Sequence, residues 1–533
     1  MIVPITVYLI IILGKYIGFY FLFPKAGQEG WKGLVPFYNY YIWTKVVGRP
    51  WWYAIVAFTP IFGTFLSLSM CIDMAKSFNK NSFLQHLGSL LVPFIQFPLW
   101  GINKDVTYKG KGATFPKTKR GIGREWGDAI VFAVIAATII RWSTFEAFMI
   151  PTSSLEGTLL AGDYLFVSKM HYGPKTAKTI LQVPLTHRAI WGTADASGQG
   201  GIKSYSTWPQ LPSYRLPGFT SVKRGDIVVF NYPGELEFPS DLRTNYVKRC
   251  VATPGDKLEI KGGEVFIDDN QTKAAKEQQF AYLIRFNGTT DVQGRQNRSI
   301  GAIEQSLVVN GAFLCQTNTF PADNSRTVVE KHNKSLLNFE KVFFKNKITE
   351  ISITRSGQNE YGLIVHTSPK KIAKIKSLNL TVINSIENIG QYNGAGGDMF
   401  AGANHPEWNN DNYGPITIPN KGMKIAITPE NLVVYEKLIT YYDNDPKDVK
   451  LTNDNKLFIK GEQVTEYTVK QDYYFMMGDN RHNSSDSRYW GFVPEDHIVG
   501  TPMLVWFSTE LRSNKSFFER IRWDRIFKYV GNE

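Results

Sequence analysis

The chain has 533 residues, which is too long for one compact domain. Its formal net charge of +13 would suit an anionic partner, but no recognisable nucleic-acid module accompanies that charge. An anionic membrane surface is therefore the better partner, and nucleic acid is excluded.

Four apolar stretches in the first 150 residues approach the length of about 20 residues that spans a bilayer. The first contains Lys15, and the last contains Arg141 between the interfacial anchors Trp126 and Trp142. No basic start and no small-residue cleavage site precede Lys25, so we expect no removable leader. The stretches cover about 2–24, 51–74, 84–101 and 126–147.

Basic residues fix the expected orientation of these spans. They gather in the loop between the third and fourth stretches, at Lys104, Lys109, Lys111, Lys117, Lys119, Arg120 and Arg124. The positive-inside rule makes this loop cytoplasmic, so the chain after residue 150 lies outside the cytoplasm. We expect a membrane domain at 1–125 with about three spans and the basic loop, a final transmembrane helix at 126–148, and an extracytoplasmic domain at 149–533. The predicted location is the cytoplasmic (inner) membrane, with several passes.

The extracytoplasmic part is predicted to be mainly β, because short apolar or alternating runs are separated by Gly, Pro, Asn and Asp. Cys250 and Cys315 are both exported on this topology, so a disulfide is permitted, but sequence cannot establish their proximity. No cluster has metal-ligand spacing, and we expect neither a metal nor a cofactor.

A polar segment, 478–491, follows the apolar run 473–477 near the end of the chain. It interleaves Asp479, Arg481, Asp486 and Arg488 with two Asn and three Ser. That inventory suits an interlocked hydrogen-bond network around a site that emerges from a buried strand.

This segment closely resembles the last signature box of bacterial type I signal peptidases, which are membrane-bound Ser/Lys proteases. Three more boxes are similar to those of the family and occur in its order, at 148–159, 224–233 and 245–256. The resemblance implies the family's β-rich peptidase fold, carrying large insertions at about 176–220 and 271–420. The multi-span beginning resembles an extension found in peptidases of the Bacteroidetes group; extra anchoring or a docking surface for the secretion channel are both open interpretations.

The resemblance implies a role for each matching residue. Ser154 falls on the nucleophile and Lys248 on the general base, which burial must keep neutral. The Ser484 hydroxyl would bond and orient the lysine amine, and the Ser154 N–H with the Thr152 hydroxyl would form the oxyanion hole. A structural network is expected at Arg249, Asp479, Asp486 and Arg488, with Asp486 and Arg488 pairing with each other or with Arg249.

The implied substrate is the signal peptide of an exported preprotein, bound as an added strand with small side chains entering two shallow pockets. The residues expected to line these pockets are Phe148, Ile150, Pro151, Leu155, Leu159, Val229, Tyr246 and Val247.

Several positions depart from the family pattern. Gly157 stands where Pro is usual, which loosens the turn after the nucleophile, and His482 replaces a common Asp. Ser153, Leu155 and Ser485 also differ, but none of these changes removes a catalytic group.

Three interpretations follow for function. The preferred one is a serine endopeptidase that removes signal peptides by an acyl-enzyme mechanism. A related self-cleaving repressor is disfavoured by the apolar spans. A non-catalytic, membrane-anchored scaffold on a signal-peptidase-like fold is the other alternative. For the basic, aromatic segment 511–533, lying on the bilayer interface and packing on the catalytic domain are equally open.

Overall fold

The computed structural model describes residues 2–58, 62–115, 122–184, 186–192, 201–208, 210–286, 350–356, 360–377, 383–389, 398–452, 454–511 and 516–531. The chain divides into two compact units. The first comprises Met1–Glu146, Ser168–Phe219 and Glu237–Leu242, and the second comprises Ala147–Val167, Thr220–Leu236 and Arg243–Glu533. The change of unit at residue 147 falls close to the expected boundary at 149, whereas segments 168–219 and 237–242 join the first unit.

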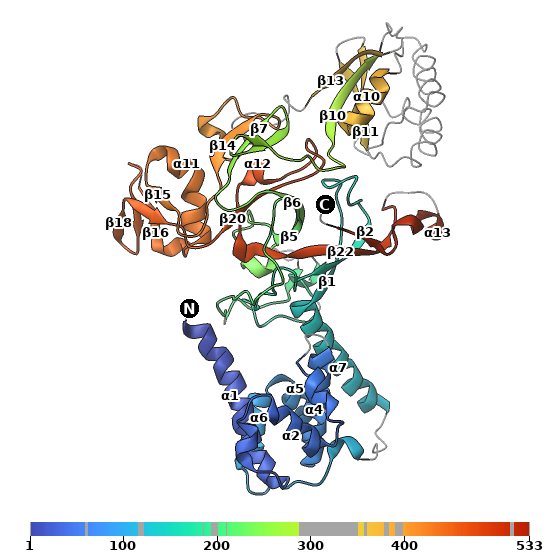
Figure 1. Cartoon of the computed structure of the whole chain (residues 1–533), viewed down its shortest axis with the longest axis vertical. Coiled ribbons are helices and arrows are strands. Elements are labelled where there is room, and N and C mark those ends of the chain that lie inside the picture. Colours follow the sequence, from blue (N-terminus) through green and yellow to red (C-terminus); the bar gives the residue numbers. More distant parts are fainter. Residues whose placement is uncertain are drawn as a thin grey trace. The chain divides into compact units, whose positions relative to one another are not determined.

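The first unit is helical up to residue 143 (Figure 1). The third apolar stretch forms two helices rather than one, because Pro93 lacks an N–H donor and pushes Val92 (φ −133°, ψ 51°) out of helical geometry. The helices are α1 (Ile2–Lys25), α2 (Tyr38–Val47), α3 (Trp52–Val56), α4 (Phe62–Ser77), α5 (Phe83–Leu91), α6 (Pro93–Ile102) and α7 (Ile122–Ser143). A hairpin of β3 (Ala189–Gly192) and β4 (Gly201–Lys203) lies within the 176–220 insertion.

Helices α1 and α6 pack closely because small residues of α1 face aromatic residues of α6. A Cβ added at Gly18 would lie 2.5 Å from the Cβ of Phe97. The Phe19 ring completes this contact, with its centroid 5.0 Å from that of Trp43 and 6.0 Å from that of Phe97. All three aromatic side chains are buried.

In the ranges that the structure describes, none of the helices is both long and apolar enough to pass through a bilayer. The loop residues Lys117, Lys119 and Arg120 lie outside the described residues. The four spans and their orientation therefore stay predictions.

The largest sheet of the second unit has eight strands among the described residues, in the order β1-β2-β22-β5-β6-β20-β21, with β23 beside β22. Its centre is apolar: every residue of β5 and of β20 is buried. The expectation that the chain after residue 149 is mainly β is confirmed. The strands are β1 (Phe145–Met149), β2 (Asp163–Ser168), β5 (Ile227–Asn231), β6 (Asn245–Ala252), β20 (Tyr473–Met477), β21 (Val493–Pro494), β22 (Ile498–Ser508) and β23 (Lys528–Tyr529).

Smaller sheets and one helix share a second apolar core in this unit, in which Tyr413, Leu457 and Phe475 are almost fully buried. The short helix α12 (Ser487–Trp490) lies within the polar segment 478–491. The elements around this core are β7 (Lys257–Lys261), β8 (Glu264–Ile267), β9 (Asn270–Gln271), β14 (Tyr413–Thr417), β15 (Lys424–Ala426), α11 (Pro429–Lys437), β16 (Val449–Leu451), β17 (Leu457–Ile459), β18 (Glu462–Val464) and β19 (Glu466–Thr468).

The described part of the 271–420 insertion forms an antiparallel sheet of its own in the order β11-β12-β10-β13, with one helix. Its elements are β10 (Phe280–Phe286), β11 (Glu350–Ser356), β12 (Glu360–Thr367), α10 (Pro369–Ser377) and β13 (Ile383–Asn388). Cys315 lies outside the described residues, and Cys250 is a buried free thiol.

The C-terminal segment packs on the second unit. Arg525 is 2 % exposed and its Nε donates to Asp163 Oδ1 at 2.9 Å, while Val530 joins the core cluster. Helix α13 (Phe517–Arg520) leaves Phe517 and Phe518 exposed. The expectation that the C-terminal segment packs on the second unit is thus confirmed. The rings of Phe517 and Phe518 remain exposed.

Candidate functional site

Ser154 and Lys248 meet in the second unit although they are far apart in the chain. Ser154 lies in the turn between β1 and β2, and Lys248 lies in the middle of β6, opposite Val228 of β5. The Lys248 Nζ is 2.6 Å from the Ser154 Oγ. Both residues are buried, at 5 % exposure for the lysine and 8 % for the serine. The predicted nucleophile and base therefore contact each other directly.

Burial favours the neutral form of the Lys248 amine, which is the form that can accept a proton. It lowers the pKa of the Lys248 ammonium from 10.5 to about 8, against the opposing charges of Asp486 and Asp479 and with some help from Arg488. The strands on both sides of β6 are apolar, and Met476 is fully buried. Because desolvation penalises the charged form, a useful fraction of the amine is neutral near neutral pH.

Ser484 lies beside this pair without making the expected hydrogen bond. Its Oγ is buried and has no hydrogen-bond partner among the described residues. A Cβ on Gly478 would come within 2.4 Å of that Oγ and within 2.5 Å of the Ser154 carbonyl oxygen. Gly478 thus leaves the space in which the nucleophile turn and Ser484 approach each other, and the bond to Lys248 is not formed in this structure.

The predicted oxyanion residue, Thr152, is exposed and lines the cleft next to Ser154. The backbone at Ser153 and Ser154 is held by residues of the polar segment 478–491. The Asn480 N–H donates to the Ser154 carbonyl oxygen at 3.1 Å, and Asn480 Nδ2 approaches the Ser153 carbonyl at 3.4 Å. Asn483 Nδ2 donates to the Ser153 hydroxyl at 3.1 Å.

Asn480 and Asn483 were not singled out as site residues from the sequence. The signal for them was the dense polar inventory of 478–491, which predicted an interlocked network without saying which members reach the nucleophile.

The predicted ionic network forms, with each arginine holding one carboxylate. Arg249 binds Asp479 through Nε and Nη2, both at 2.7 Å. Arg488 binds Asp486 at 2.9 and 2.8 Å. Burial by itself would raise the pKa of Asp486, but the Arg488 guanidinium holds it below its usual value. The partner of Arg249 is therefore Asp479, and Asp486 pairs with Arg488.

These pairs secure the loop that bears Ser484. Asp486 Oδ2 accepts the Gly478 N–H at 3.1 Å, and Asp479 Oδ2 accepts the Thr158 hydroxyl at 2.7 Å. The loop is thus tied to both β20 and the turn after the nucleophile.

A cleft of about 570 Å³ opens beside Ser154 and Lys248. Leu159 and Val229, which were expected in its wall, are instead fully buried in the core cluster beneath it and do not line it. The other predicted substrate residues do line it. The lining comprises Phe148, Met149, Ile150, Pro151, Thr152, Ser153, Ser154, Leu155, Thr244, Asn245, Tyr246, Val247, Lys248, His482, Asn483, Ser484, Ser485 and Tyr489.

In the part of the chain that the structure describes, no group of three or more His, Cys, Asp or Glu side chains is arranged to hold a metal ion. Cys250 is buried, and its Sγ lies 3.4 Å from the Ala252 carbonyl oxygen. It is a structural neighbour of Lys248 in β6.

Two family models match parts of this chain. A family model described as signal peptidase, peptidase S26, matches residues 123–314 and 414–507. A second model, a family of unknown function (DUF5684), matches residues 31–111.

Some curated relatives match most of the chain at low identity, and others match short parts of it at higher identity. Signal peptidase I of Buchnera aphidicola subsp. Acyrthosiphon pisum is 24% identical over 383 residues, which are 72% of this chain and 74% of the relative. Signal peptidase I of Helicobacter pylori is 42% identical over 81 residues, 14% of this chain and 28% of the relative. That of Haemophilus influenzae is 44% identical over 71 residues, 13% of this chain and 20% of the relative.

Proposed function

Since the chain belongs to the signal peptidase family, peptidase S26, we propose that it cleaves signal peptides from preproteins with Ser154 as nucleophile and Lys248 as general base. The chain is a serine peptidase that removes signal peptides; the residue assignments are what the proposal adds. The observation that carries them is the buried contact of 2.6 Å between Lys248 Nζ and Ser154 Oγ.

The geometry supports a two-step acyl transfer. The neutral Lys248 amine accepts the Ser154 proton while Oγ attacks the scissile carbonyl. The oxyanion of the tetrahedral intermediate accepts hydrogen bonds from the Ser154 N–H and the Thr152 hydroxyl. The lysine then returns the proton to the leaving amine, and in the second step it takes a proton from the water that hydrolyses the acyl-enzyme.

The cleft suits an extended peptide with small side chains. Its wall joins apolar residues on either side of the dyad, with Ile150 and Leu155 from the nucleophile turn and Val247 from β6. An added strand would gain backbone hydrogen bonds, and its alternate side chains would point into this wall. We assign this wall to the small residues that precede the cleavage site.

The proposed location is the cytoplasmic membrane, with the catalytic unit on its outer face and the bilayer and preproteins as partners. The apolar stretches before residue 148 and the basic loop before α7 support this placement. The exposed aromatic rings of α13 would suit the bilayer interface. Docking on the secretion channel is a further role for the N-terminal extension, supported only by its added length.

The test is cleavage of a preprotein with an Ala-x-Ala site by the full-length enzyme in detergent, across a pH series. Cleavage should rise with pH through about 8, where the buried lysine loses its proton. Lys248→Ala should lower kcat by at least about 10²-fold, the usual contribution of a general base. Lys257→Ala is the matched control, since that lysine is exposed on the surface.

Two results would contradict the assignment of Ser154 and Lys248. One is folded wild-type protein that cleaves no signal peptide, and the other is Lys248→Ala protein as active as wild type. The first result would favour the scaffold interpretation.

A further inference from the structure

Residues near the start of the inserted segment 271–420 contact the polar segment 478–491, which is called the catalytic loop below. The Gln279 N–H donates to the Asp479 carbonyl at 2.8 Å, and the Arg481 N–H donates to the Gln279 carbonyl at 2.9 Å. Gln279 and Asn480 thereby form a parallel bridge. Gln279, near the start of the insertion, thus pairs like a short strand with the catalytic loop. The same loop binds the backbone of Ser154 through Asn480.

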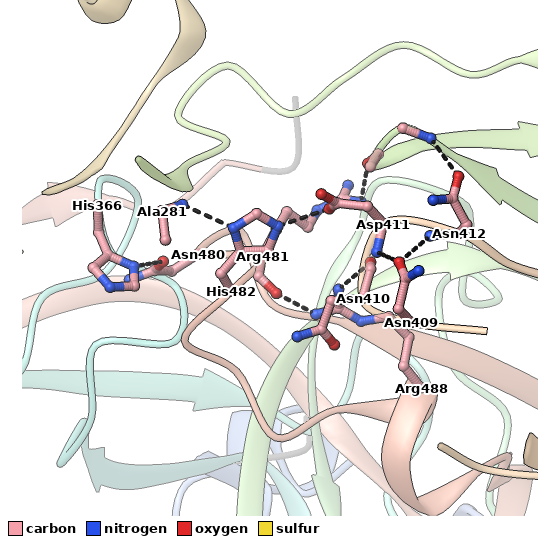
Figure 2. A network of polar contacts seen from close by, with 12 residues as sticks. Ala281, His366, Asn409, Asn410, Asp411, Asn412, Asn480, Arg481, His482 and Arg488 are labelled. Carbon is pink, nitrogen blue, oxygen red and sulfur yellow. Dashed lines mark hydrogen bonds and ion pairs between the residues drawn. The ribbon is translucent and has the colours of Figure 1, made fainter. Parts of the chain in front are cut away.

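His482 extends this contact through its ring (Figure 2). Its Nδ1 accepts the Ala281 N–H at 2.8 Å, and its Nε2 lies 2.7 Å from Asp411 Oδ1. Because Nδ1 must be the acceptor, Nε2 carries the proton and donates to the carboxylate. The imidazole side chain is fully buried, and the Phe280 ring meets it edge-on at 5.3 Å. His482 therefore joins both ends of the insertion to the loop.

His366 of β12 makes a second connection from the same insertion. Its Nδ1 lies 3.1 Å from Asn480 Oδ1 (Figure 2). Burial lowers the pKa of His366 to about 4, so the ring is neutral near neutral pH and Nδ1–H is the donor. The other side of Asn480 holds the carbonyl groups of Ser153 and Ser154. A chain of contacts therefore leads from the inserted sheet to the nucleophile.

The turn after the nucleophile abuts the insertion as well. Gly157 has φ +92°, which a proline cannot adopt. A Cβ at this position would lie 2.7 Å from the Cβ of Glu277. The two departures from the family pattern at Gly157 and His482 thus both occur where the insertion meets the catalytic core.

We propose that the 271–420 insertion positions the nucleophile, with His482 and His366 as positioning residues that act through the loop and Asn480 on Ser154. The insertion is in this view an integral support of the active site rather than an appendage. The proposal rests on the Ser154/Lys248 activity proposed above.

The test compares four histidine variants of the full-length enzyme, with kcat, KM and thermal unfolding measured for each. His482→Ala and His366→Ala should lower kcat about 10-fold or more and leave KM unchanged, since misplacing a reacting group by about 1 Å can cost 10²-fold. His482→Asn should recover part of kcat, because its side-chain oxygen can accept the Ala281 N–H. His405→Ala is the matched control, as this histidine of the same insertion is half-exposed and contacts Glu407 and Trp408. The pH midpoint should stay where it is, because Lys248 keeps its surroundings.

The outcomes separate this proposal from the proposed function. Inactive wild-type enzyme would count against the function itself. Active wild type with folded His482 and His366 variants of unchanged kcat would overturn the positioning role alone, as would a rise in KM at constant kcat, which would place the insertion against the substrate. If the His482 variants fail to fold, kcat of His366→Ala decides by the same criteria.

Discussion

At the scale of single residues, the site joins the buried Lys248 amine to the Ser154 hydroxyl at 2.6 Å. Lys248 is kept from water by strands on both sides, and Ser154 is its close neighbour. Ser484 contributes a buried hydroxyl without a hydrogen-bond partner among the described residues. A buried polar group left unpaired costs about 1–3 kcal/mol, so its presence beside the dyad points to a role in the reaction rather than in folding.

Ser484→Ala provides a test at this scale. Removing an unpaired buried hydroxyl should leave the free energy of unfolding unchanged or raise it by about 1 kcal/mol. If the hydroxyl orients the lysine during turnover, kcat should fall about 10-fold or more, by analogy with other lost hydrogen bonds in active sites. Thermal unfolding and kcat measured on the same preparation check both parts. A variant that is destabilised but fully active would identify Ser484 as a structural residue.

At the scale of elements, the neighbouring strands β5 and β6 differ in their position relative to the cleft. Val247 of β6 lines the cleft, while Val229, its register partner in β5, is completely buried in the core. The two valines occupy paired register positions on one face of the sheet, but only Val247 lines the cleft. We therefore propose that specificity is set by β6 and by the turn that bears Ser154, with β5 packing beside β6 in the sheet.

Val247→Trp should abolish cleavage, because the indole fills the wall where a small side chain would enter. The protein should remain folded, since Val247 is only partly buried. Cleavage assays with circular dichroism check this, and unchanged turnover would remove Val247 from the pocket.

Val229→Ala should act on stability instead. Loss of two buried methyl groups is expected to cost about 1–3 kcal/mol, with cleavage-site preference unchanged. Denaturant unfolding and product mapping measure the two effects separately. A changed preference at full stability would return Val229 to the substrate wall.

At the scale of the whole molecule, the placement across a membrane is the feature most open to direct experiment. The prediction puts the basic loop in the cytoplasm and the catalytic unit outside. The variants Lys104→Cys and Lys421→Cys, each at an exposed position, test the two sides of the membrane once Cys315 has been replaced, since Cys71 and Cys250 are buried. In intact cells an impermeant maleimide should label Lys421→Cys, while Lys104→Cys should react only after the membrane is opened. The reverse pattern would invert the topology.

The sequence by itself determined the chemistry of this protein. Ser154, Lys248 and the polar segment 478–491 lie in motifs that resemble those of the signal peptidase family, and the alternation of short apolar runs predicted a mainly β domain after residue 149. The basic loop before α7 likewise follows from composition alone, although the spans beside it remain a prediction.

Only the tertiary structure decided how these parts meet. Val247 and Val229 are register partners on one face of the sheet, and only the packing of neighbouring elements buries Val229 fully and leaves Val247 at the cleft. The partner of Arg249 and the contact of His482 with Asp411 join segments far apart in the chain. Such pairings depend on long-range packing and on the buried donors and acceptors that it leaves to be satisfied, and for that reason no local motif announces them.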